Sequence, residues 1–113
     1  MEKTEEQYER EFEEIEEMFP NAKFTIAINI EELDVIFTKQ PAIVVKKSYN
    51  CYCYTGCNKP SEYFYISGKN ITTKFIINQL IEQGLELDCN HHFIEGFEKV
   101  KGSDCQFKIY AGS

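Results

Sequence analysis

The sequence of 113 residues lacks any apolar run that approaches the roughly 18 residues of a membrane span. It also lacks, at its acidic beginning Met1–Glu6, the apolar segment that a secretory signal contains. We therefore expect no membrane partner and no secretion. We expect the protein to be in the reducing cytosol, where its five cysteines remain mostly thiols. The odd number of cysteines agrees, because one chain cannot pair all of them.

Positive charge is also scarce in the first part of the chain. Residues 1–20 contain nine Glu against Lys3 and Arg10, a balance of −7, whereas residues 21–113 carry ten acidic residues and ten Lys. The whole net charge of −7 therefore belongs to the first segment. A nucleic-acid binder needs a cationic surface that displaces counterions from phosphates. We therefore expect no direct nucleic-acid partner.

Motifs of catalysis are missing as well. The sequence has no glycine-rich phosphate loop, nucleophile elbow or metalloprotease motif. Residues 88–92 (DCNHH), with Glu95 nearby, do combine a nucleophile with candidate bases. However, adjacent residues on a strand point to opposite faces, so His91 and His92 would not act together. We predict that the protein is not an enzyme and takes no cofactor, and that this segment is a polar turn.

The cysteines and histidines support one hypothesis of a metal site. Structural zinc takes four tetrahedral sulfur or nitrogen ligands, which usually arrive as two close pairs. Cys53 and Cys57 flank a turn that contains glycine, and Cys89 and His91 form a second pair. The pairs lack the common two-residue spacer, and Cys51 and Cys53 fit a strand as small apolar residues. Free cysteines are therefore the favoured interpretation. A small zinc-stabilised binding module that uses Cys53, Cys57, Cys89 and His91 is the alternative.

The acidic segment is predicted to form an amphipathic helix over residues 4–19. Thr4 can cap the helix, Gln7 completes a capping box, and Pro20 prevents its continuation. An apolar stripe at helical spacing comprises Tyr8, Phe12, Ile15 and Phe19, with Met18 beside them. The simpler interpretation is that this stripe packs on its own domain; the alternative is that it binds a partner.

The remainder of the chain alternates irregularly between short strands and helices, which favours an α+β fold with a small, mostly antiparallel sheet. Strands are expected at residues 23–30, 42–54 and 63–66, and a second helix from about Thr72 to Gln83, followed by Gly84. Residues 93–100 and 105–110 are predicted to form a C-terminal hairpin. Residues 30–37 fit a strand or a short helix. We expect one domain over residues 1–113, in which the acidic helix of residues 1–20 precedes a charge-neutral body of residues 21–113.

Tyrosines on strands suggest a surface for self-association. Tyr52 and Tyr54 share one face of the 42–54 run, and tyrosine on a strand face suits an interface. A short chain with two amphipathic surfaces gains stability by sharing them. We therefore expect a homodimeric, non-enzymatic interaction protein. Its contact surface would be the helix stripe or the tyrosine-bearing strands, and its acidic helix could also meet a basic partner protein.

Residues of the C-terminal half carry a family resemblance. They comprise Thr55-Gly56-Cys57, the helix opened by Ile71-Thr72 and closed by Gly84, residues 89–97 (CNHHFIEGF), residues 104–107 (DCQF) and the final Gly112-Ser113. Over residues 55–113 the sequence resembles a small uncharacterised family of giant nucleocytoplasmic large DNA viruses, of the marseillevirus and mimivirus kind. The family has no activity to carry over. The resemblance implies a viral protein that is made in the host cytoplasm and acts by protein contacts, with packaging in the virion left open.

Zinc content separates the two interpretations of the cysteines. We expect the full chain, purified without chelators, to hold less than about half an equivalent of zinc, because the ligand spacing departs from the common pattern. Elemental analysis by mass spectrometry measures this content. One full equivalent that is lost in Cys57→Ser and retained in Cys105→Ser would instead establish the zinc module.

Overall fold

The computed structural model of the protein describes residues 4–46, 61–87 and 93–112. Five strands form the main sheet: β1 (Thr25–Ile26), β3 (Ala42–Lys46), β4 (Glu62–Ile66), β6 (Phe93–Lys99) and β7 (Gln106–Gly112). Their order in the sheet is β1-β6-β7-β3-β4. The antiparallel pairs β6–β7 and β3–β4 have the longest registers, while β1–β6 and β3–β7 are parallel. The expected α+β class is therefore confirmed, and the sheet is mixed.

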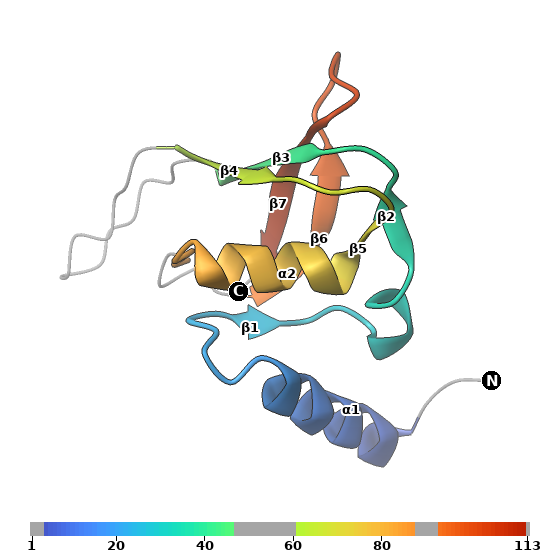
Figure 1. The fold of residues 1–113 in the computed structure, drawn as a ribbon. Coiled ribbons are helices and arrows are strands. Elements are labelled where there is room, and N and C mark those ends of the chain that lie inside the picture. The colour runs from blue at the N-terminus through green and yellow to red at the C-terminus, as the bar shows by residue number, and fades with distance from the viewer. Residues whose placement is uncertain (1–3, 47–60, 88–92, 113) are drawn as a thin grey trace, which may run out of the picture.

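The helix α2 (Thr73–Glu82) supplies much of the core beside the sheet (Figure 1). The Thr72 hydroxyl caps it by accepting the backbone N–H of Phe75 at 3.1 Å. Beyond the helix, Gly84 adopts a φ of +81°, which terminates the helix as the sequence predicts. The apolar side of α2 is fully buried and belongs to the same core cluster as residues of β3, β4, β6 and β7; the helix contributes Ile76, Ile77 and Leu80.

Residues 30–37, which the sequence leaves open, contain both kinds of structure. A 3-10 helix covers Ile30–Glu32, and β2 (Ile36–Thr38) follows it. This strand pairs in antiparallel fashion with β5 (Ile71–Thr72), forming a separate two-stranded sheet. The Phe37 ring meets Phe97 and Phe107 edge-on, with centroid separations of 5.8 and 4.8 Å. These contacts pack the small sheet against the β6–β7 hairpin.

The strand expected at residues 23–30 is only partly formed. Its alternating burial extends over the expected range, but only two of its residues pair with a neighbouring strand. Phe24, Ile26 and Ile28 are all buried, as alternation predicts. Only Thr25 and Ile26 are in register with β6, and the N–H of Ala27 donates to the Ile94 carbonyl at 2.7 Å. The strand β1 is thus a short edge strand. The acidic helix α1 (Glu5–Met18) lies beside it (Figure 1).

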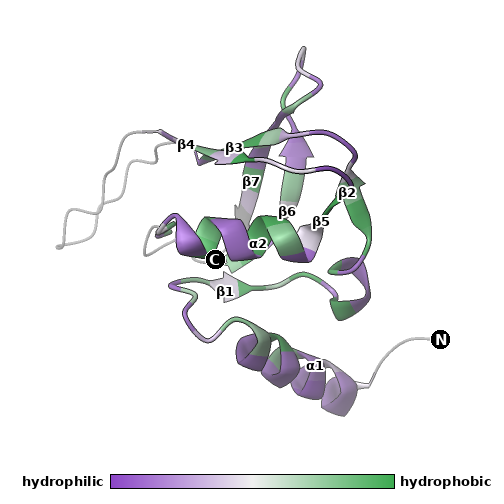
Figure 2. Cartoon of the chain, in the orientation of Figure 1, coloured by the Kyte–Doolittle hydropathy of each residue, from purple (hydrophilic) through white to green (hydrophobic). Residues whose placement is uncertain are grey.

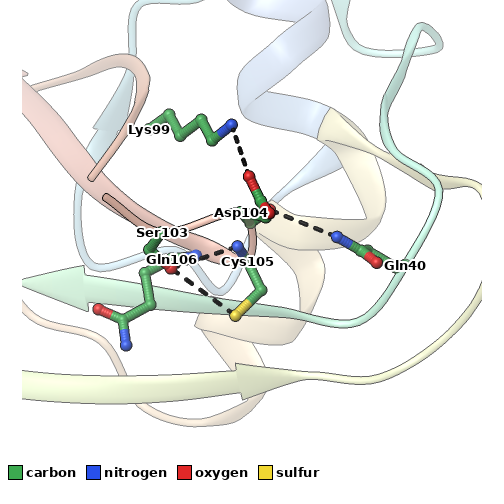
Figure 3. Close-up of polar contacts among 6 residues, drawn as sticks. All are labelled: Gln40, Lys99, Ser103, Asp104, Cys105 and Gln106. Carbon is green, nitrogen blue, oxygen red and sulfur yellow. Dashed lines mark hydrogen bonds and ion pairs between the residues drawn. The ribbon is translucent and has the colours of Figure 1, made fainter. Parts of the chain in front are cut away.

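The C-terminal hairpin is confirmed, and polar contacts hold the loop between β6 and β7 (Figure 3). Ser103 Oγ accepts the backbone N–H groups of Cys105 at 3.3 Å and Gln106 at 3.2 Å. Lys99 Nζ donates to Asp104 Oδ1 at 3.2 Å, and Gln40 Nε2 donates to the Asp104 carbonyl at 3.4 Å. The loop is therefore tied both to its own hairpin and to the segment that precedes β3.

Replacing Gly84 by alanine tests how the second helix ends. Alanine at φ +81° must adopt the left-handed conformation, which costs roughly 1–2 kcal/mol. No atom lies within 4 Å of the added Cβ, so packing does not contribute. We expect urea denaturation to show a loss of about this size in the free energy of unfolding. Gly96→Ala is the control, since Gly96 has equal space and no positive φ, and its change should stay within about 0.5 kcal/mol. Equal losses in the two variants would refute this explanation.

Candidate functional site

The helix α1 begins with the cap that the sequence predicts, but the charges in its last turn interact unfavourably with the helix dipole. Thr4 and Gln7 form the capping box, with Thr4 N–H donating to Gln7 Oε1 at 2.9 Å and Gln7 N–H donating to Thr4 Oγ1 at 3.3 Å. Acidic residues in the first turn suit the positive end of the helix dipole. The last turn carries Glu16 and no basic residue, which places negative charge at the negative end. A cation bound near this end would relieve that repulsion.

The apolar stripe of α1 is divided between the core and the surface. Ile15 and Phe19 are 5% and 4% exposed and belong to the core cluster. Phe12 and Tyr8, one and two turns earlier, are 39% and 53% exposed. Of the four stripe residues that the sequence offers as a contact surface, Tyr8 and Phe12 remain on the surface. Self-packing, the simpler interpretation, holds for the C-terminal half of the helix.

A groove runs between α1 and β1, on the side where the helix meets the body. It encloses ≈ 610 Å³ and is lined by the helix side chains Phe12, Ile15, Glu16 and Phe19 and by residues of the 20–26 segment. A second hollow of ≈ 360 Å³ continues along the helix and is lined by Tyr8, Glu9, Phe12 and Glu13. Phe12 lines both hollows, so the two form one strip along the helix. We call this strip, with Tyr8, Phe12 and the 20–26 wall, the helix groove.

Carboxylates dominate the electrostatics of the helix groove. Glu9, Glu13 and Glu16 line it, and among the described residues no cation pairs with them. Lys23 is the basic residue of the wall, and its Nζ lies 3.0 Å from Glu86 Oε1. That pairing offsets its positive charge locally. Figure 2 shows the hydrophilic character of α1 as a whole. The groove therefore combines an apolar floor with negative charge.

The remaining predicted site residues fall outside the part of the chain that is described. This holds for the tyrosines Tyr52 and Tyr54 and for the candidate zinc ligands Cys53, Cys57, Cys89 and His91. Within residues 4–46, 61–87 and 93–112, no group of three or more His, Cys, Asp or Glu could hold a metal ion. Cys105 lies there partly buried, with its Sγ 3.8 Å from Ser103 Oγ (Figure 3). Both interpretations of the cysteines remain predictions.

One feature of the surface is not predicted from the sequence. It is the 20–26 wall of the helix groove, which depends on how α1 folds back beside β1 after Pro20. The strong exposure of Tyr63, Tyr65 and Tyr110 does have a signal in the sequence. These tyrosines alternate with the residues that are buried in β4 and β7, which are Phe64, Ile66, Phe107 and Ile109.

Comparisons with known proteins give no relative: no family model, no curated protein and no solved structure matches this chain. In the described part of the chain, no helix is both long enough and apolar enough to cross a membrane.

Replacing Ile15 and Phe12 separately tests the division of the helix stripe. Ile15→Ala should lower the free energy of unfolding by about 2–5 kcal/mol, because it removes a side chain from the core. Phe12→Ala should cost less than about 1 kcal/mol, because its ring is largely outside the core. Urea denaturation measures both values. Similar losses at the two positions would contradict the half-docked arrangement of α1.

Proposed function

We propose that this protein is a non-enzymatic interaction protein that binds a basic amphipathic segment of a partner protein in the helix groove. One observation carries the proposal: an exposed aromatic strip lies beside carboxylates that no cation of the described chain neutralises. An amphipathic helix that lays its apolar face in a hydrophobic groove is a common mode of peptide recognition.

The apolar part of the groove supplies the anchor site. Phe12 lines both hollows and leaves more than a third of its surface in water. An apolar side chain of the partner would cover this ring and fill the larger hollow beside it. Aromatic residues at the centre of an interface commonly carry most of the binding free energy.

The charge of the groove supplies selectivity for a basic partner. Glu16 lies in the last turn of α1, so a partner cation there would interact favourably with the carboxylate and with the helix dipole. Lys23 is held by Glu86 and therefore repels such a cation little. An acidic segment would meet only repulsion from Glu9, Glu13 and Glu16.

The spacing of the carboxylates matches helical periodicity in the partner. Positions 9, 13 and 16 lie about 6 and 4.5 Å apart along the axis of α1, from its rise per residue. Lysine or arginine residues at i, i+4 and i+7 of a partner helix repeat with the same intervals. Such a helix would present its cations to all three carboxylates while its apolar residues face Phe12.

We further propose, from the sequence resemblance of residues 55–113 to a giant-virus family alone, that this interaction takes place in an infected host cell. In that setting the protein is made in the host cytoplasm, and its partner is a host protein or another viral protein. Packaging in the virion would follow if the partner is itself a virion component.

A synthetic helical peptide tests the groove directly. The probe is a fluorescein-labelled peptide of leucine and lysine, with lysine at i, i+4 and i+7 and leucine on the adjoining face. We expect fluorescence anisotropy to detect binding that weakens at least about tenfold between roughly 50 and 500 mM salt, as screening shortens the Debye length. Phe12→Ala should weaken binding by about tenfold although it leaves every charge in place.

Two controls separate groove binding from general attraction to an acidic protein. Phe75→Ala removes a ring of α2 with the same exposed fraction, 39%, and should leave the affinity unchanged. A peptide of identical composition in scrambled order should bind more weakly, because its cations and apolar residues share no face. Affinity that ignores salt, or that is equal for Phe12→Ala and the parent protein, would count against the proposal.

A further inference from the structure

Three tyrosines project from the side of the main sheet that α2 does not cover. In β4, Phe64 and Ile66 are buried in the core, so Tyr63 and Tyr65 point to the opposite side. The strand register places Tyr65 beside Ile43 and Tyr63 beside Val45 in β3, and one strand further, in β7, Gln106 lies opposite Ile43 and Lys108 opposite Val45. Tyr110 lies two residues beyond Lys108 and shares the same side. We call this surface the tyrosine face: Tyr63, Tyr65 and Tyr110 with Ile43, Gln106 and Lys108.

The three tyrosines of the tyrosine face are each more than half exposed. Tyr63, Tyr65 and Tyr110 are 57%, 70% and 51% exposed. A tyrosine buries about 150–250 Å² when it is fully covered, so these exposed fractions leave roughly 350 Å² of the three residues available for contact. A standard interface buries about 800 Å² on each partner. The rings alone therefore supply a little under half of the area that a stable dimer needs, and the side chains between them can supply more.

We propose that a second copy of this chain packs on the tyrosine face and forms a two-fold symmetric dimer. A two-fold interface uses the same patch on both copies, so the patch must contain features that complement each other. Beside the projecting rings, Ile43 and Tyr65 line a hollow of ≈ 380 Å³ together with Pro41 and Cys105. A tyrosine of one copy can enter the hollow of the other, which is the arrangement of an aromatic anchor in a pocket.

The distribution of charge selects this face for self-association. Glu98 of β6, which the register places opposite Lys108, is balanced locally, as its Oε2 lies 3.2 Å from Lys108 Nζ. The chain beyond residue 20 has no net charge, and α1 lies on the far side of α2 from β3 and β4 (Figure 1). Dimerisation here keeps the two acidic helices apart. Contact between the helices would instead bring two segments of charge −7 together.

Packing of the two faces is favoured over pairing of the two β4 edges. Among the described strands, β4 pairs only with β3 and forms an edge of the sheet. The Tyr65 carbonyl, however, accepts a hydrogen bond from Gln83 Nε2 at 3.0 Å. A strand added at this edge would compete with that bond. The rings of Tyr63 and Tyr65 remain available on the face of the sheet without breaking it.

Sedimentation equilibrium of the full chain at about 1–100 μM tests the dimer. We expect a dimer in the parent protein, and a dissociation constant raised about 100-fold or more in the double variant Tyr63→Ser, Tyr65→Ser. Circular dichroism and thermal unfolding check that this variant folds, which its exposed positions favour. The matched double variant Tyr8→Ser, Phe12→Ser should remain a dimer. Raising the salt concentration should keep or strengthen the dimer, because it screens repulsion between the acidic helices.

Each other outcome overturns the inference. A parent protein that is a monomer over the whole concentration range removes the dimer altogether. A dimer that persists in the folded Tyr63, Tyr65 variant places the interface elsewhere. A dimer that is lost in the Tyr8, Phe12 variant assigns self-association to α1. None of these results alters binding of the basic peptide to the parent protein unless α1 itself is the interface, so the two proposals fail separately.

Discussion

Burial of Ile15 and Phe19 is the contact on which the arrangement of this molecule depends, because it attaches the acidic helix to the body. The helix is weak by itself: Glu5, Glu9 and Glu13 repel at intervals of four residues, at about 0.2–0.5 kcal/mol for each pair. Negative charge in its last turn adds about 0.3–1 kcal/mol of unfavourable interaction with the dipole. Burying two large apolar side chains stabilises by about 1.5–3 kcal/mol each, which exceeds these costs. Burial of Ile15 and Phe19, which we call the anchor, therefore stabilises α1 as a helix at this place on the body.

The same anchor explains why the surfaces of the protein differ so strongly. It holds the C-terminal half of α1 against β1 and leaves Tyr8 and Phe12 beside a row of carboxylates. On the other side of α2, the sheet presents tyrosines in a setting without net charge. One surface thus suits a partner of opposite charge, and the other suits a copy of the same chain. The acidity belongs to one helix, and this segregation makes the two roles compatible.

The local signals in the sequence were sufficient for the helices and the hairpin. The capping box at Thr4 and the glycine at position 84 mark helix ends that the structure reproduces closely. The parallel pairing of β3 with β7 and the pairing of β2 with β5 join residues distant in sequence, and no local pattern specifies them. Phe37 illustrates the limit, since the rings that it contacts, Phe97 and Phe107, are distant from the ambiguous 30–37 segment in the sequence. Half of the candidate site was predicted. Helical periodicity identifies the apolar stripe of α1, but it does not tell which end of the stripe is buried against the rest of the protein.

The central claim is that α1 is anchored at one end and offers its groove to a basic partner. Nuclear magnetic resonance of the ¹⁵N-labelled protein, titrated with the leucine–lysine peptide, tests it most directly. The account predicts that amide shifts change along residues 8–16 and 22–26, while those of Tyr63, Tyr65 and Tyr110 stay in place. Changes distributed over all acidic residues, or centred on the tyrosine face, would contradict it.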